Sequence, residues 1–419
     1  MEKKSVSWFS IFAVPFVFLC SDCAGKVGAA ISIAKRGAIA SKQFARKTNS
    51  SRSEEKAAAY RGEKTSQHSS AENVVNNTEV QEKETSSSTI QYNTEARQAI
   101  VMDCDTGEVL FAKQQDEKCV PSSMTKLMTI YLLFEALVDG RIHLDDKLPV
   151  SEKAQRIGGS KSFFETKNSV SLEDIIRSIV VHSGNDGCIV FAEKLSGDED
   201  AFAAEMNQKA QELGMKNTNF LNSTGLPNPD HCASVSDLAL LTRRLIADFP
   251  QFYHYFSEKT FTYNSITQES RNTLLGNSLN VDGLKTGFTK DGGYGIAISA
   301  KKDGKRLIAI VNGCRSNKVR LREANRLLAM GFKEFITIKI ADPAIASGKF
   351  AVSAGKRNNI DLFVKEPIVP SIPKRHRKSL IIELNVQEPI PAPITAGTKL
   401  GELTYKYHKF ISKKYALFA

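Results

Sequence analysis

The order of strand-like and helix-like segments is the feature that most restricts the fold of this 419-residue chain. Two strand-like runs come first, a block of helical patterns follows, and strand patterns then return before a last helix; these groups occupy 98–112, 121–248, 261–311 and 317–335. Strands at both ends of such a unit can pair only if the chain returns on itself. The order therefore predicts an α+β fold with one antiparallel sheet flanked by helices and a helical subdomain beside it.

The start of the chain has the pattern of a secretory signal. Lys3 and Lys4 precede an apolar run, 8–19, and small residues follow up to Ala30. This pattern predicts a cleaved signal peptide at 1–29 and hence export across the cytoplasmic membrane to the periplasm or cell envelope. An uncleaved anchor or a short buried strand is the alternative, but the apolar run is shorter than a membrane span requires, and no later segment resembles a span.

Composition divides the rest of the chain. A content of 41% hydrophobic and 25% charged residues excludes a wholly disordered chain, but residues 30–95 are rich in Ser, Thr and Asn and predict a disordered polar linker. Its basic residues could contact anionic lipid or wall polymer, although a solvated linker is the simpler interpretation. Residues 96–337 then have the composition of one globular domain, and the short, proline-rich strand patterns of 338–419 predict a small β domain.

The first of three motifs is Ser123-Met124-Thr125-Lys126. Residues i and i+3 share one face of a helix, so the Lys126 amine is expected beside the Ser123 hydroxyl. A lysine with a lowered pKa can take the serine proton and activate the hydroxyl as a nucleophile. Ser-x-x-Lys alone is a weak signal, since such pairs also arise by chance on exposed helices.

The second motif, Ser183-Gly184-Asn185, interrupts an apolar helical run and predicts a turn between two helices. In the functional interpretation, Ser183 relays a proton to the leaving amine, while Asn185 holds a substrate amide and helps to fix Lys126. In the structural interpretation, the turn only joins two capped helices.

The third motif is Lys285-Thr286-Gly287, followed by Phe288. We expect it on an exposed strand that pairs with an extended peptide. Lys285 and Thr286 would bind a terminal carboxylate, and Gly287 would let the substrate backbone approach. The N–H groups of Ser123 and Phe288 would form an oxyanion hole. An edge strand with a surface lysine is the simpler interpretation, but the order and spacing of the three motifs favour one shared cleft.

These motifs and their flanks resemble the serine penicillin-binding proteins, specifically the low-molecular-mass D-alanyl-D-alanine carboxypeptidases, whose fold serine β-lactamases share. The likeness extends from about Ala96 to Phe335 and is carried by 121–129, 182–186 and 277–287. It implies a β-lactamase/transpeptidase-like fold and an acyl-enzyme on Ser123. It further implies the peptidoglycan stem pentapeptide as substrate and covalent binding of β-lactam antibiotics.

The resemblance also assigns recognition of the substrate carboxylate to Arg320, and it likens residues from about 338 to the family's C-terminal β domain. Family members commonly end in an amphipathic anchoring helix. The last residues here, 415–419, are too few for one, so membrane attachment is expected only through an uncleaved signal.

The remaining reactive residues receive structural interpretations. His182 lies in an apolar run, and His231 has no partner at the spacing of a zinc site, so neither a metal nor a cofactor is expected. The five cysteines after the signal are an odd number, which requires a free thiol or a pair between chains. Nucleic-acid binding is not expected, because the basic residues lack an aromatic platform.

Three rival functions stay open. A β-lactamase would share the chemistry, but Gly184 stands where that class usually has aspartate, and an endopeptidase would act on cross-links instead. A non-catalytic wall-binding or scaffold protein would use only the β domain and the linker. The intact Ser123, Lys126 and Lys285 argue against that last function.

Overall fold

The computed structural model describes residues 31–32, 92–407 and 410–419. The predicted signal peptide lies outside the described residues, and so does the predicted linker apart from the strand β1 (Ile31–Ser32) and residues 92–95. The globular unit already includes Thr94, whose buried hydroxyl donates a hydrogen bond of 2.8 Å to Glu323.

Five antiparallel strands form the central sheet, in the order β3-β2-β10-β9-β8. They are β2 (Gln98–Asp103), β3 (Val109–Lys113), β8 (Val281–Thr289), β9 (Gly293–Lys302) and β10 (Lys305–Cys314). The late strand β10 pairs with the early strand β2, with Ile308 opposite Met102. The two ends of the unit therefore meet in one sheet, which confirms the predicted α+β fold and leaves β8 at an edge.

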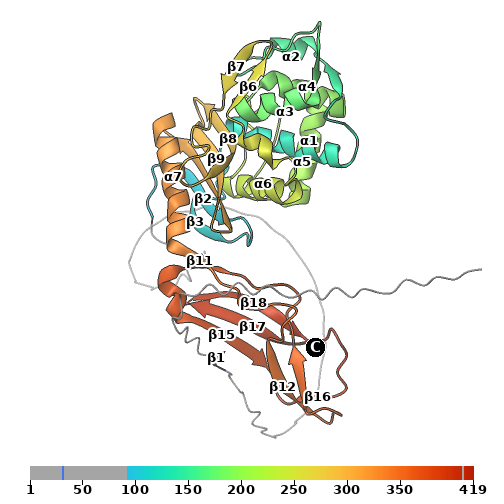
Figure 1. The fold of residues 1–419 in the computed structure, drawn as a ribbon, viewed down its shortest axis with the longest axis vertical. Helices are drawn as coiled ribbons and strands as arrows, with labels where there is room; N and C mark the ends of the chain where they lie inside the picture. The colour runs from blue at the N-terminus through green and yellow to red at the C-terminus, as the bar shows by residue number, and fades with distance from the viewer. Residues whose placement is uncertain (1–30, 33–91, 408–409) are drawn as a thin grey trace, which may run out of the picture.

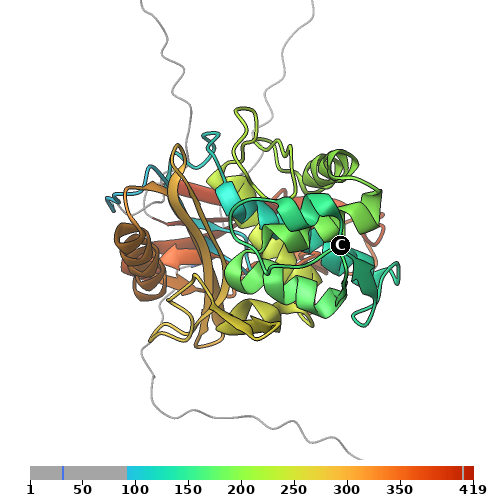
Figure 2. The same cartoon turned by 90° about the horizontal axis from the view of Figure 1, so that it is seen from above.

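The strand alternation gives the sheet two apolar faces. Ile100 and Ile308 pack with α1 (Lys126–Val138) and α6 (Val235–Asp248) on one face. On the other face, Val101 and Ala309 pack under the long helix α7 (Asn317–Glu334). Figure 1 shows α7 along one side of the sheet and the helical block on the other, and the view from above in Figure 2 shows the same layers.

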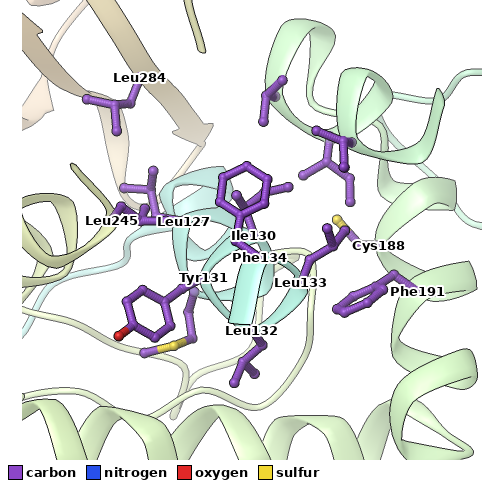
Figure 3. Packing of buried hydrophobic residues seen from close by; sticks show 14 of the residues in the cluster. Leu127, Ile130, Tyr131, Leu132, Leu133, Phe134, Cys188, Phe191, Leu245 and Leu284 are labelled. Carbon is purple, nitrogen blue, oxygen red and sulfur yellow. The ribbon is translucent and has the colours of Figure 1, made fainter. Parts of the chain in front are cut away.

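The helical subdomain is built around α1, which is nearly all buried. Leu133 and Phe134 of α1 lie among apolar residues that include Cys188 and Phe191 of a neighbouring helix (Figure 3). The other helices are α2 (Glu152–Arg156), α3 (Leu172–Arg177), α4 (Asn185–Ser196) and α5 (Glu199–Leu213). Short 3-10 and π segments adjoin them: η1 (Ser122–Thr125), η2 (Ser178–His182) and η3 (Tyr253–Ser257).

Capping residues lie at the ends of several helices. The Ser171 hydroxyl accepts the Asp174 N–H at 3.1 Å, as a capping serine does, and α5 ends at Gly214 with a φ of 84°. Ser234 caps α6, since its hydroxyl accepts the Asp237 N–H at 3.1 Å, whereas the Ser236 hydroxyl donates to Asp116 at 2.6 Å.

Two small hairpins border the subdomain. One pairs β4 (Lys147–Pro149) with β5 (Ser169–Ser171), and the other pairs β6 (Thr260–Tyr263) with β7 (Ile266–Glu269). From the second hairpin the chain continues through residues 270–280 into β8, the strand that carries the third motif.

Residues from about 338 form a separate layer of strands below the catalytic unit in Figure 1. Their strands are β12 (Gly348–Ser353), β13 (Asn359–Leu362), β15 (Leu380–Val386), β16 (Ile390–Pro391), β17 (Lys399–Tyr407) and β18 (Phe410–Phe418), and η4 (Lys374–Ser379) precedes β15. At the junction, β11 (Phe335–Thr337) pairs with β14 (Ser371–Pro373). The Tyr405 hydroxyl donates to Glu108 of the catalytic unit at 2.9 Å. Among the described residues, no helix is long and apolar enough to cross a membrane.

Candidate active site

Ser123 and Lys126 lie one helical turn apart at the start of α1, as the first motif predicts. The Lys126 Nζ donates to the Ser123 Oγ at 3.1 Å. Ser123 belongs to η1, and Lys126 is the first residue of α1. The amine is therefore within direct proton-transfer distance of the hydroxyl.

The Lys126 amine is fully buried and held by two further acceptors. Its Nζ donates to the Asn185 Oδ1 at 2.7 Å and to the Thr224 carbonyl oxygen at 2.6 Å. Burial lowers the pKa of Lys126, since the charged form loses its hydration. A neutral amine has a lone pair, so this environment prepares Lys126 to act as a base.

A second lysine of the site, Lys285 on β8, is also buried. Burial, followed by the positive charge of Lys126, holds the pKa of Lys285 well below its usual range. Its amine donates to the Thr286 carbonyl oxygen at 3.3 Å. Two amines in one buried site disfavour simultaneous protonation, because each charge penalises the other.

The second motif forms a turn between η2 and α4, as the sequence predicts. Ser183 has a φ of 74°, in the left-handed region that favours glycine. Its hydroxyl is buried and makes no hydrogen bond to any described residue. A buried hydroxyl without a partner is costly, and strained residues of this kind are concentrated at functional sites.

Asn185 begins α4 and connects the turn to two other segments. Besides accepting from Lys126, it donates through Nδ2 to the Gly158 carbonyl oxygen and through its backbone N–H to the Ser160 carbonyl oxygen, each at 2.7 Å. The amide therefore fixes the lysine of the first motif and a loop that belongs to none of the three motifs.

The third motif lies on the edge strand β8 against the segment that carries the serine. A Cβ atom on Gly287 would lie 2.8 Å from the Pro121 carbonyl oxygen and 3.1 Å from the Ser122 Cβ. Only glycine permits that approach without displacing backbone. Thr286 is buried beside it, whereas the Phe288 side chain is 51% exposed.

Arg320 reaches β8 from α7. Its guanidinium donates to the carbonyl oxygens of Gly287 and Gly295, each at 3.2 Å, and lies 5.6 Å from the centre of the Tyr294 ring. Burial lowers the pKa of Arg320 to about 10. The structure therefore brings Arg320 to the third motif, where it contacts the backbone of β8.

The structure adds residues that the sequence analysis missed. Arg271 donates to the His182 carbonyl oxygen at 3.2 Å, and its charge lowers the pKa of both site lysines. It follows β7 in a loop with no motif, so the sequence offered no signal. Thr224 acts through its backbone carbonyl, which any residue type could supply.

Asp186 is a residue near the site that the sequence analysis missed but could have found, since its carboxylate directly follows Asn185 of the second motif. It is fully buried and accepts the N–H groups of Ser162, at 2.8 and 3.0 Å, and of Phe164, at 3.3 Å. It therefore ties the 158–164 loop to the turn of the second motif.

The two histidines pack inside the unit. His182 is hydrogen-bonded to the Ser162 hydroxyl at 2.9 Å and stacks on Phe261. His231 bridges the Thr125 hydroxyl at 2.8 Å and the Leu221 N–H at 3.1 Å. Among the described residues, no group of three or more His, Cys, Asp or Glu could hold a metal ion. The five thiols of the described part are free: Cys104, Cys119, Cys188, Cys232 and Cys314.

The fold and these contacts define the class of protein: serine peptidases in which lysine, held by an asparagine from a second motif, stands beside the nucleophile. The family description "D-alanyl-D-alanine carboxypeptidase" matches residues 81–316, and "Penicillin-binding protein 5, C-terminal domain" matches 337–419. The chain belongs to the D-alanyl-D-alanine carboxypeptidase family S11, as a low-molecular-mass penicillin-binding protein.

Named relatives agree with this membership. The chain is 35% identical to the D-alanyl-D-alanine carboxypeptidase DacF of Bacillus subtilis over 322 residues, which are 74% of this chain and 82% of that protein. It is also 35% identical to DacC of Escherichia coli over 320 residues, 74% of this chain and 80% of that protein. Penicillin-binding protein 5 of Haemophilus influenzae superposes with a TM-score of 0.73 at 33% identity, covering 78% of this chain and 97% of that chain. The expected enzyme family and fold are therefore confirmed.

Proposed function

We propose that this enzyme is exported and removes the terminal D-alanine from peptidoglycan stem pentapeptides through an acyl-enzyme on Ser123. The observation that carries the proposal is the position of the Lys126 amine, which lies 3.1 Å from the Ser123 hydroxyl. This amine is buried, and burial lowers its pKa. The names of the relatives, which are D-alanyl-D-alanine carboxypeptidases, support the substrate.

In acylation, Lys126 takes the Ser123 proton while the hydroxyl oxygen attacks the carbonyl carbon of the penultimate D-alanine. The oxyanion that forms is stabilised by the backbone N–H groups of Ser123 and Phe288. The bond to the terminal D-alanine then breaks, and Ser183 gives its hydroxyl proton to the departing amine while it takes the proton held by Lys126, which leaves Lys126 neutral again. The buried Ser183 hydroxyl, which has no hydrogen-bond partner among the described residues, is free for that contact.

In deacylation, neutral Lys126 accepts a proton from a water molecule that attacks the ester carbonyl. The ester bond to Ser123 then breaks, Lys126 returns the proton to the Ser123 oxygen, and the shortened peptide leaves as a carboxylate. Substrate binding falls to the edge strand β8, where a peptide can add as a further strand. Its terminal carboxylate would meet Lys285, Thr286 and the charge of Arg320, while Asn185 would bind the amide on the other side of the scissile bond.

Covalent binding of β-lactam antibiotics follows from the same chemistry, since their carbonyl would acylate Ser123. A solved structure of penicillin-binding protein D2 from Listeria monocytogenes, 31% identical to this chain with a TM-score of 0.54, is an ampicillin-bound form. That likeness supports the proposal, and fluorescent penicillin labelling of the purified enzyme tests it directly.

The decisive assay is release of D-alanine from diacetyl-Lys-D-Ala-D-Ala. Wild type should release D-alanine, whereas Ser123→Ala and Lys126→Met should lose activity by at least about a thousandfold. Lys302→Met, at an exposed position on β9, is the matched control and should keep activity. An inactive wild type, or a fully active Ser123→Ala variant, would contradict the proposal. Rapid hydrolysis of the penicillin adduct would indicate a β-lactamase instead.

Export is supported by the charged and apolar pattern of residues 1–29. Fusing these residues to a reporter that is active only outside the cytoplasm should give signal, and replacing the apolar run 8–19 with polar residues should abolish it. A silent wild-type fusion would contradict the proposed localisation in the cell envelope.

A further inference from the structure

Two phenylalanine rings are strongly exposed on segments that carry the active site. Phe163 is 52% exposed and Phe288 is 51% exposed. Phe288 directly follows Gly287 on β8, and Phe163 belongs to the 158–164 loop, whose backbone accepts two hydrogen bonds from Asn185. A single exposed apolar side chain is ordinary. Exposure alone therefore does not indicate a function, and the backbone conformation at these positions is needed as further evidence.

The backbone holds Phe163 outward. Its φ is 64°, an outlier for a bulky side chain. The neighbouring N–H groups, those of Ser162 and Phe164, both bond to the buried Asp186 carboxylate. The Phe164 ring is buried and packs on Tyr263 at 4.8 Å. Of these two consecutive rings, that of Phe164 is therefore held in the core, and that of Phe163 points into solvent.

Two further hydrogen bonds hold the backbone of the loop that carries Phe163. The Lys161 carbonyl oxygen accepts from Gln268 of β7 at 2.9 Å, and the Ser160 carbonyl oxygen accepts from the Asn185 N–H at 2.7 Å. The ring of Phe288 packs on one side, because it lies 4.2 Å from the Tyr294 ring, which Arg320 covers. Conformations of this cost persist where function requires them.

We propose that Phe163 and Phe288 form an apolar subsite that contacts the side chain of the residue preceding the two alanines. This inference rests on the proposed function. A peptide that pairs with β8 and places an amide at Asn185 would pass Phe288 and extend toward the 158–164 loop, since Asn185 bonds to the Gly158 and Ser160 carbonyl oxygens of that loop. Aromatic rings there select a long aliphatic side chain, which buries its methylene groups against them.

The test compares two substrates that differ only at that residue: diacetyl-Lys-D-Ala-D-Ala and acetyl-Gly-D-Ala-D-Ala. The measured quantity is the ratio of their kcat/KM values. Phe163→Ala should lower this ratio about tenfold, which corresponds to about 1.4 kcal/mol of lost contact. Phe163→Tyr keeps the ring and should keep the ratio, and Ile345→Ala, at a 65% exposed position of the C-terminal β domain, should keep it as well.

The Phe163→Gly variant distinguishes the loss of the substrate contact from a loss of protein stability. Glycine adopts a φ of 64° without strain, so its thermal unfolding midpoint should equal or exceed that of wild type while the ratio falls as in Phe163→Ala. An active wild type with an unchanged ratio in both variants would overturn the subsite and leave the proposed function standing. A wild type that cleaves neither peptide would overturn the proposed function and the subsite together.

Discussion

The Asn185 Oδ1 lies 2.7 Å from the Lys126 Nζ and accepts its hydrogen bond, although 59 residues separate the two in sequence. The second motif therefore holds the amine of the first, besides its expected role in holding substrate. The carbonyl oxygen of Thr224 holds the same amine from another side, so the lone pair of a neutral Lys126 can be directed at Ser123.

This contact predicts the effect of a charge at position 185. In Asn185→Asp, a carboxylate beside Lys126 would favour the protonated amine and raise its pKa. The acidic limb of the pH profile for penicillin acylation should therefore move to higher pH, with a rate at neutral pH lowered by about a hundredfold. The measurement is the acylation rate between pH 5 and 10.

Asn185→Ala serves as its control, since it removes the acceptor without adding a charge. Its rate should fall, while the pH limb should not shift upward. Equal pH profiles for Asn185→Asp and wild type would show that Asn185 does not influence the base.

Gly287 predicts a steric effect. In Gly287→Ala, the added Cβ would meet the Pro121 carbonyl oxygen at 2.8 Å, so β8 must move away from Ser123. We expect kcat/KM to fall about a hundredfold with the fold intact, since small displacements at a site are costly. Gly158→Ala is the matched control, because its Cβ would meet nothing within 4 Å. Wild-type activity in Gly287→Ala would be incompatible with this close packing.

Arg320 predicts an effect on substrates with a free carboxylate. Lysine cannot bridge the Gly287 and Gly295 carbonyl oxygens as the guanidinium does. Arg320→Lys should therefore raise KM for the free peptide about tenfold, and less for the same peptide with an amidated C-terminus. Parallel steady-state kinetics on the two peptides would measure this, and identical KM changes would assign Arg320 a purely structural role.

Two buried histidines predict how stability depends on pH. Burial lowers the pKa of both His182 and His231 to about 4, from 6.5. Above pH 6.5 both are neutral in the folded and unfolded states, so they leave stability unchanged. As pH falls from 6.5 toward 4, both histidines become protonated in the unfolded chain but stay neutral in the folded chain. The free energy of unfolding therefore falls by about 3 kcal/mol for each histidine.

Urea unfolding at pH 7 and pH 4.5 would measure this loss. His182→Gln keeps a donor for the Ser162 hydroxyl and cannot be protonated, so it should reduce the pH dependence by about half. A variant with the full wild-type pH dependence would mean that His182 does not contribute.

Much of the fold could be predicted because local patterns and the final contacts agree. The pairing of β2 with β10 follows from the order of strands and helices, and α7 was expected at 317–335 and found at Asn317–Glu334. The cap of α6 could not be chosen from the sequence, because Ser234 and Ser236 are equally suitable there. Only the contact of Ser236 with Asp116, 120 residues away, separates them.

The sequence by itself determined the chemistry of this protein, because Ser123, Lys126 and the other motif residues carry functional groups whose spacing already requires a helix, a turn and a strand. Tertiary structure decided the burial, the hydrogen-bond partners and the electrostatic surroundings of those groups. Burial of Lys126 and Lys285, the backbone carbonyl of Thr224, the charge of Arg271 and the outward ring of Phe163 all depend on segments distant in the chain. Burial and electrostatic fields are sums over neighbours in space, so no local pattern of residues encodes them.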